Sequence, residues 1–162
     1  MAWLAETRVN WLERTLAGLD RLARWRRGAQ ELPPHLAVGI AGEDAAYFYL
    51  LRKGYTVVAR RWSAGNLRGD IDLIAWQGSL LCFFEVKTRT AHDATPPEAA
   101  VDQHKRATLR RLAWQYVRQL PQPEAPQVRF DVVSVYLEAG RKEIMHFENA
   151  FAWRERRSAW DL

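Results

Sequence analysis

Two apolar, β-rich runs separated by a very short turn constrain the fold of this chain more than any other feature. The runs IDLIAW (71–76) and LLCFFEVKTR (80–89) are joined by the tripeptide QGS, which is typical of a β-hairpin. Charged side chains inside such runs are costly to bury unless they are paired or bind a metal ion. Asp72, Glu85 and Lys87 interrupt this hairpin, so they are the first candidates for a functional role.

The pairing of the two runs decides whether these charges meet. If Trp76 pairs with Ser79 across a two-residue turn, Glu85 faces Asp70, and Asp72 lies diagonal to Glu85. Because side chains alternate along a strand, this register places four charged residues on one face: Asp70, Asp72, Glu85 and Lys87. The other face carries an apolar set suited to a core: Ile71, Leu73, Cys82, Phe84 and Val86. A slip of one residue would separate Asp72 from Glu85.

Two adjacent carboxylates indicate a site for a hard cation. Asp72 and Glu85 repel each other unless positive charge lies between them, and Mg²⁺ and Mn²⁺ prefer carboxylate oxygens. Lys87 adds a positive charge that can orient a water molecule or stabilise a phosphate that gains charge. This combination is typical of phosphodiester hydrolysis, and a solvated ladder of surface charges is the structural alternative. Since both residues should face a cleft, we expect Glu85→Ala and Lys87→Ala to leave the fold intact.

The remaining periodicity predicts an α/β domain. We expect a first helix over 3–27 and two core helices over 42–53 and 102–119. Strands are expected over 55–62, 71–76, 80–89, 129–137 and, as a short last strand, 144–147. The helix between the third and fourth strands indicates a mixed sheet with helices on its faces. We divide the chain into an N-terminal amphipathic helix and linker (1–37), one α/β domain (38–152) and a C-terminal tail (153–162).

Composition excludes several classes of protein. No apolar run approaches the roughly 18 residues of a membrane span, and a single cysteine, Cys82, permits neither an internal disulfide nor a zinc finger. We therefore expect a cytoplasmic protein. The 24 Lys and Arg, 20 of them arginine, favour a nucleic-acid partner, although an arginine-rich genome would give the same composition. The helix over 3–27 could pack on the domain or on a second copy, act as a basic arm, or lie on a membrane surface.

Longer motifs resemble a known family. Six of them occur in order over about residues 38–152: GEDAAYFYLLRKGYTVVARRW, GDIDLIA, FFEVKTRT, AVDQHKRATLRRLAWQYV, RFDVV and ENAF. Together they resemble the YraN-like uncharacterised bacterial proteins of the PD-(D/E)xK nuclease superfamily, which are similar in fold to archaeal Holliday junction resolvases. The resemblance implies a restriction-endonuclease-like mixed sheet flanked by helices. It also implies metal binding by Asp72, Glu85, Glu43 and the main-chain carbonyl of Val86, with Lys87 positioning the attacking water. Taken alone, Glu43 would be explained as a charge that complements a helix N-terminus.

The sequence leaves two functions in competition. The first is a metal-dependent endonuclease, with Mg²⁺ or Mn²⁺ as cofactor, that hydrolyses phosphodiester bonds of nucleic acid. The resemblance favours DNA, branched DNA included, while the residues themselves leave RNA open. Seven side chains near the site would contact the backbone: Arg60, Arg61, Arg68, Arg89, Gln103, Lys105 and Arg106. The alternative is a non-catalytic nucleic-acid-binding or scaffold protein that retains the nuclease fold. Junction-cleaving relatives act as dimers, so the resemblance also implies a homodimer.

Overall fold

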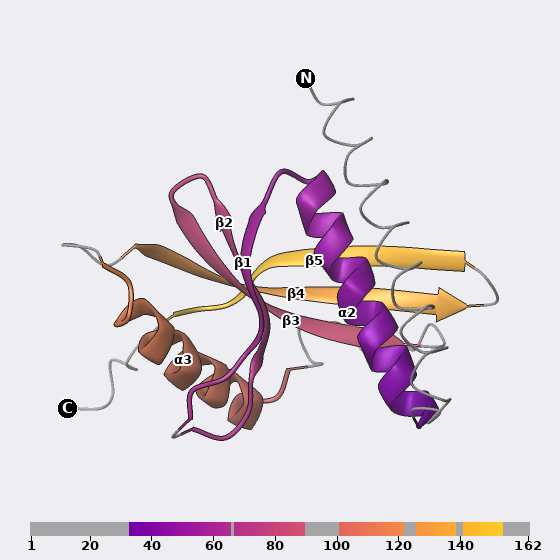
Figure 1. The fold of residues 1–162 in the computed structure, drawn as a ribbon, viewed down its shortest axis with the longest axis horizontal. Coiled ribbons are helices and arrows are strands. Elements are labelled where there is room, and N and C mark those ends of the chain that lie inside the picture. The colour runs from indigo at the N-terminus through magenta and orange to yellow at the C-terminus, as the bar shows by residue number, and fades with distance from the viewer. Residues whose placement is uncertain (1–32, 66, 90–100, 122–125, 139–140, 154–162) are drawn as a thin grey trace, which may run out of the picture.

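The computed structural model describes residues 33–65, 67–89, 101–121, 126–138 and 141–153 (Figure 1). In chain order the elements are α2 (Pro34–Arg52), β1 (Thr56–Trp62), β2 (Ile71–Gln77), β3 (Leu80–Arg89), α3 (Gln103–Val117), β4 (Gln127–Glu138) and β5 (Arg141–Phe151). The helix expected over 3–27 and nearly all of the expected C-terminal tail lie outside the described residues. Among the described helices, none is long and apolar enough to cross a membrane.

The five strands form one mixed sheet in the order β1-β2-β3-β4-β5 (Figure 1). β3 and β4 are parallel, and the other neighbouring pairs are antiparallel. Antiparallel strands can follow each other through short turns, whereas a parallel pair requires a crossover, and α3 lies in the connection between β3 and β4. The predicted α/β class, a mixed sheet flanked by helices as in restriction-endonuclease-like domains, is confirmed.

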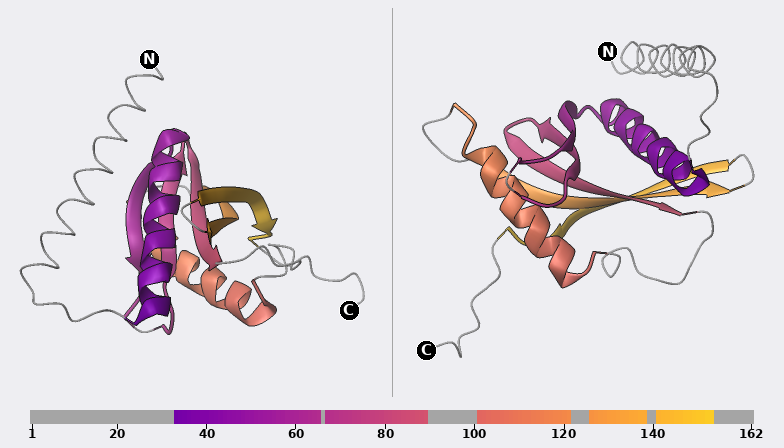
Figure 2. Two further views of the ribbon diagram at one scale, coloured as in Figure 1. Left: turned by 90° about the vertical axis from the view of Figure 1, so that its right-hand side faces the viewer. Right: turned by 60° about the horizontal axis from the view of Figure 1, so that its bottom comes forward.

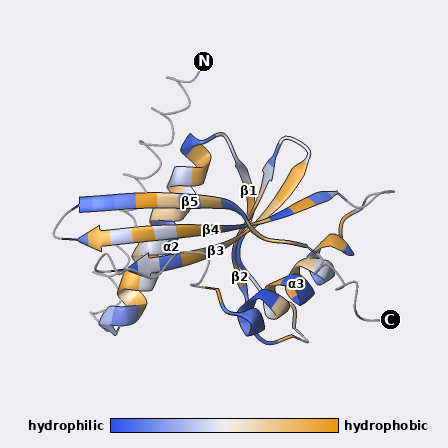
Figure 3. Ribbon diagram, turned by 180° about the vertical axis from the view of Figure 1, so that it is seen from behind, coloured by the Kyte–Doolittle hydropathy of each residue, from blue (hydrophilic) through white to orange (hydrophobic). Residues whose placement is uncertain are grey.

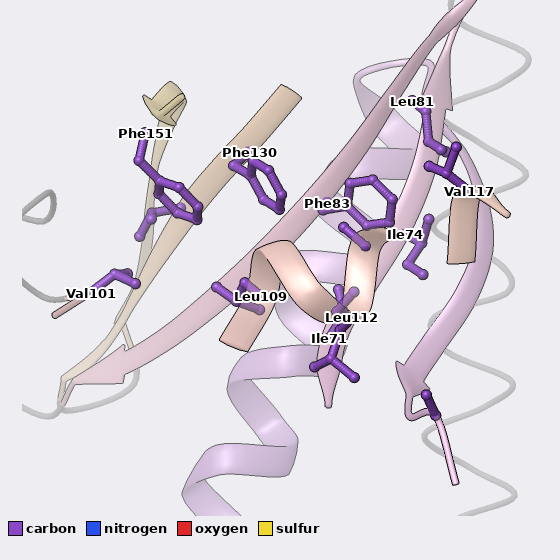
Figure 4. Packing of buried hydrophobic residues seen from close by; sticks show 13 residues of the cluster. Ile71, Ile74, Leu81, Phe83, Val101, Leu109, Leu112, Val117, Phe130 and Phe151 are labelled. Atoms are coloured by element: carbon purple, nitrogen blue, oxygen red, sulfur yellow. The ribbon is translucent and has the colours of Figure 1, made fainter. Parts of the chain in front are cut away.

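Of the described helices, one covers each face of the sheet (Figure 2). Leu109 and Leu112 of α3 pack on the face that carries Phe83 (Figure 4), and Leu50 of α2 packs on the face that carries Phe84. The two neighbouring phenylalanines point to opposite faces, as alternation along a strand requires. Because both faces are buried, β3 is an almost continuous apolar run rather than an alternating one.

The hairpin keeps the predicted faces of β3 but has a different register. Trp76 pairs with Leu81 and not with Ser79, because the two-residue turn consists of the glycine and serine at 78 and 79. The difference is two residues, an even number, so the parity that brings Asp72 to the side of Glu85 is preserved. The predicted pairing of Trp76 was therefore wrong, and the inference drawn from it about the two carboxylates was unaffected.

The β2–β3 ladder ends at the pair Leu73 and Phe84. Beyond it, Ile71 packs in the cluster on the α3 side (Figure 4), although alternation predicted it on the α2 side with Leu73. At this end β2 is paired with β1 through Ile71 and Trp62, so the β2–β3 alternation no longer constrains its side chains. The two strands separate at the position of the charged residues.

Two element boundaries differ from the prediction. α2 begins at Pro34 instead of residue 42. The prediction missed this start because the first turn of the helix is solvent-exposed and carries no apolar periodicity. Proline suits the first position of a helix, where its missing N–H is not needed. β5 runs from Arg141 to Phe151 instead of 144–147. It is an edge strand with many exposed side chains, hydrophilic at its Arg141 end and more hydrophobic further along (Figure 3), so the apolar signal covered only its middle.

Candidate active site

The candidate site lies where β2 and β3 separate. There the Oδ2 atom of Asp72 accepts a hydrogen bond of 2.6 Å from the main-chain N–H of Val86. This bond holds the aspartate beside the neighbouring residue on β3, Glu85. On the same face, Asp102 caps α3 by accepting a hydrogen bond of 2.7 Å from the N–H of Lys105. The cap fixes the helix start from which the Lys105 side chain reaches the sheet.

Glu85 is buried between two lysines. Its side chain is 4% exposed, with Oε1 at 2.9 Å from Nζ of Lys87 and Oε2 at 3.0 Å from Nζ of Lys105. A buried carboxylate requires such compensation, and removing it would leave both ammonium groups without their partner. The prediction that Glu85 faces an open cleft is therefore wrong, whereas Lys87 and Lys105, about one-third exposed, do reach solvent.

The two carboxylates share the available positive charge unequally. Burial and the charge of Glu85 raise the pKa of Asp72 from 3.8 to about 7, although the Val86 N–H and the charge of Lys105 act in the opposite direction. Burial is the largest single effect on the pKa of Lys105 and lowers it, but the charge of Glu85, its hydrogen bond and the charges of Asp72 and Asp70 together raise this pKa overall. Both lysines contact Glu85, so Asp72 is the carboxylate that lacks positive charge.

Glu43, the third predicted metal ligand, lies near this pair but is engaged elsewhere. Its Oε2 atom is ion-paired with Nε of Arg61 on β1, and its charge contributes to the raised pKa of Asp72. Across the described ranges, no three His, Cys, Asp or Glu side chains form a group that could hold a metal ion. The structure thus brings together Asp72 and Glu85. Metal binding by these two residues, by Glu43 and by the carbonyl of Val86 stays a prediction.

The chemistry of the pair fits a divalent cation. Carboxylate oxygens are the donors that Mg²⁺ and Mn²⁺ prefer. Oε2 of Glu85 is buried and, within the described part of the chain, has no partner with hydrogen-bond geometry, in spite of its ion pair with Lys105. The raised pKa of Asp72 indicates that an added positive charge would be favourable there. Two protein carboxylates are a usual complement for Mg²⁺, which keeps several waters.

Some of the predicted nucleic-acid contacts are ion-paired within the protein. Arg60 and Arg61 pair with Asp44 and Glu43 of α2, so their charge is already compensated. Lys105 was expected among the residues that contact the backbone, and the structure places it directly on the Glu85 carboxylate. Lys105 therefore lies closer to the two carboxylates than the sequence predicted.

The other predicted contacts are spread over α3, β3 and the β1–β2 connection. Arg106 donates a hydrogen bond of 2.8 Å from Nε to the carbonyl of Val101, which occupies one of its donors. Gln103 is exposed at the start of α3, Arg89 is half-buried at the end of β3, and Arg68 is exposed in the β1–β2 connection. Backbone contacts by these residues stay predictions.

Ser134 is a residue near the site that the sequence did not indicate. It pairs with Lys87 in the parallel ladder of β3 and β4, so the two side chains are neighbours on the same face. Ser134 is fully buried, and its Oγ has no hydrogen-bond partner among the described residues. No pattern marks a single serine in an apolar strand, so only the register identifies it.

A second buried charge lies on the opposite face of the sheet. Asp131 is 1% exposed and pairs in register with Phe84. Its carboxylate accepts hydrogen bonds of 2.8 and 2.7 Å from Arg129 and one of 2.9 Å from the N–H of Asn149, and it lies 2.9 Å from Nε2 of His146. These partners satisfy it fully, so it fastens β4 to β5 and is not a vacant site.

Comparison with known proteins agrees with the motifs. The uncharacterised protein family UPF0102 matches residues 42–135. A UPF0102 protein of Koribacter versatilis is 47% identical over 119 residues, which cover 74% of this chain and 82% of that protein. One from Solibacter usitatus is 49% identical over 104 residues, 64% of this chain and 78% of that protein. One from Porphyromonas gingivalis is 41% identical over 122 residues, 74% and 87% of the two chains. The chain therefore belongs to the uncharacterised protein family UPF0102, the YraN-like proteins that its motifs resemble.

Proposed function

We propose that this protein is a metal-dependent endonuclease that hydrolyses phosphodiester bonds of nucleic acid. The observation that carries the proposal is the convergence of a buried carboxylate pair, Asp72 and Glu85, with two partly exposed lysines, Lys87 and Lys105. A structural ion pair would need only one cation for Glu85. The second lysine and the uncompensated aspartate instead match a site that accepts a cation and a phosphate together.

Each residue has a distinct role in this proposal. Asp72 and Glu85 would hold Mg²⁺ or Mn²⁺, which when bound neutralises phosphate charge and makes water a better nucleophile. The Lys87 ammonium has three donors, so it can keep its contact with Glu85 and also orient the attacking water. The Lys105 ammonium would stabilise the negative charge that develops on the phosphate oxygens. Both lysines are fixed by Glu85 before any substrate arrives, which reduces the cost of positioning them.

The substrate class follows from charge. The net charge of +5 and the arginines of the chain favour a polyanion, and DNA is the substrate that we infer from the family resemblance. We compare cleavage of branched DNA, linear DNA and RNA in Mg²⁺ and in Mn²⁺. Metal-dependent cutting of one of them is expected, and its absence for all three would contradict the proposal.

Matched variants test the roles of the residues. Lys87→Met should lower the rate of cleavage by roughly a hundredfold or more, and Asp72→Asn should abolish metal binding measured by calorimetry. Lys53→Met is the control, because Lys53 lies at the end of α2 over the Tyr49 ring and not in the site. Equal loss in Lys87→Met and Lys53→Met would show that the lysine acts through net charge alone. Nucleic-acid binding without metal binding or cleavage would favour the non-catalytic alternative.

A further inference from the structure

A hollow beside the candidate site lies between α3 and the connection from β1 to β2. It has a volume of about 370 Å³ and is lined by Leu67, Arg68, His104, Thr108 and Arg111. Figure 1 shows this connection running alongside α3. Nothing in the predicted metal site uses the hollow, and four of its five lining residues were not among the predicted nucleic-acid contacts.

Glycine at position 69 allows the connection to approach α3 closely. Gly69 has φ of 94°, a conformation that residues with a side chain rarely adopt. A Cβ atom on it would lie 3.2 Å from Cγ2 of Thr108, so the backbone rests directly on the helix. The adjacent residue, Arg68, is thereby held over the turn of α3 that carries Arg111. The hollow is a product of this packing and not of a loop standing in solvent.

The lining has the chemistry of an anion site. It offers two guanidinium groups and one imidazole, and none of the described acidic residues lines it. Arg68 and Arg111 are exposed, and neither forms an ion pair with any other described residue, in contrast to Arg60 and Arg61. Guanidinium groups bind phosphate through two parallel hydrogen bonds. The hydroxyl of Thr108 donates to the carbonyl of His104 and can still accept a hydrogen bond from an arginine.

The hollow lies close to the carboxylate pair. Arg111 is six residues after Lys105 on α3, a rise of about 9 Å, and Lys105 contacts Glu85. Arg68 precedes Asp72 by four residues. One strand of a duplex carries a phosphate about every 3.4 Å along its axis, so the rise of α3 from Lys105 to Arg111 matches the axial length of about three nucleotides.

We propose that this hollow binds a backbone phosphate of the same nucleic-acid strand that presents another phosphate, a few nucleotides away, to Asp72 and Glu85. The inference rests on the proposed function for the identity of the ligand, and on the hollow alone for its chemistry. Binding in the hollow requires no metal ion, because Arg68 and Arg111 supply the positive charge. It anchors the strand and so sets which phosphate is presented to the carboxylates.

The test compares two arginines of the same helix. Binding of a fluorescent DNA duplex is measured in EDTA over a range of salt concentrations for the parent, Arg111→Gln and Arg118→Gln. Arg118 is exposed at the end of α3 and does not line the hollow. Arg111→Gln should weaken binding and reduce the slope of log affinity against log salt by about one, while Arg118→Gln should leave the slope unchanged. Equal effects of both variants would overturn the inference.

A second measurement separates this inference from the proposed function. Inorganic phosphate is titrated into the labelled protein and followed by nuclear magnetic resonance. Saturable shifts of the Thr108 and Arg111 amides that disappear in Arg111→Gln support the hollow even if the protein cleaves nothing. Cleavage by the parent with no such shifts, and with unchanged DNA binding by Arg111→Gln, would reject the hollow and retain the nuclease.

Discussion

Asp72→Asn should stabilise the protein at alkaline pH, although it removes a residue of the candidate site. The pKa of Asp72 is raised from 3.8 to about 7 by burial and by the charge of Glu85. The folded state therefore binds the proton more tightly than the unfolded state. This contribution to stability is fully present below about pH 4 and is lost as the pH rises through 7. Asparagine is neutral throughout and can still accept the hydrogen bond from the N–H of Val86.

The magnitude follows from the shift. One pKa unit corresponds to about 1.4 kcal/mol, so the shift of Asp72 corresponds to up to about 4 kcal/mol of unfolding free energy lost between pH 4 and pH 8. Between these limits the parent should lose about 1.4 kcal/mol per pH unit relative to the variant. Because Lys105 also contacts the pair and can adjust, the measured difference should lie at or below this limit.

The assay is urea unfolding of the parent and Asp72→Asn in metal-free buffer at pH 4.5, 6, 7 and 8. The two proteins should differ little at pH 4.5, and the variant should be more stable at pH 8. Added Mg²⁺ should stabilise the parent at pH 8 and leave the variant unchanged, since ligand binding to the folded state adds stability. A variant that is less stable than the parent at pH 8, or a difference that does not change with pH, would refute the reasoning.

Four further substitutions, one of them a control, test packing around the site and behind it. Gly42→Ala should destabilise the fold by about 1 to 3 kcal/mol, because a Cβ atom there would overlap the side chain of Thr88. Gly39→Ala is the control: it lies in the same helix with open space around it, and it should be neutral or stabilising by up to about 1 kcal/mol. Thermal unfolding compares the two variants. Ser134→Ala should raise the melting temperature, since its buried hydroxyl has no partner, and a lower melting temperature would reveal a hydrogen bond that this hydroxyl makes in solution. Asp131→Ala should cost about 3 to 5 kcal/mol, because an arginine and a histidine would lose their buried partner; urea unfolding of this variant with a cost below about 1 kcal/mol would contradict that role.

The sequence was sufficient to predict the part of the sheet in which the apolar pattern of a run and the short turn beside it indicate the same structure. The run LLCFFEVKTR is apolar and β-rich because β3 is buried on both faces. The tight turn that joins β2 to β3 permits only an antiparallel pairing of the two strands. The exact turn residues were less constrained, and the predicted register differed by two. Because every second side chain of a strand lies on the same face, a register error of two residues still leaves Asp72 beside Glu85.

Contacts between elements distant in the chain could not be predicted in the same way. Nothing local to Lys105 distinguishes it from the other basic residues of α3, and its place on Glu85 depends on how the helix docks on the sheet. Asp131 gave the same signal as Asp72, a charge within an apolar strand, but one became fully hydrogen-bonded and the other did not. A sequence pattern identifies buried charges, and only the packing shows which of them lacks a charged partner of its own.

The charge balance of the site links Glu43 to cation binding. Without a metal ion, three carboxylates (Asp72, Glu85 and Glu43) are matched by Lys87, Lys105 and Arg61. These partners are not evenly placed, because both lysines serve Glu85. A divalent cation beside Asp72 would attract Glu43 and compete with Arg61 for it. The Arg61 guanidinium, exposed on β1, would then be free to contact the phosphate backbone. Cation binding and backbone contact by Arg61 should therefore reinforce each other.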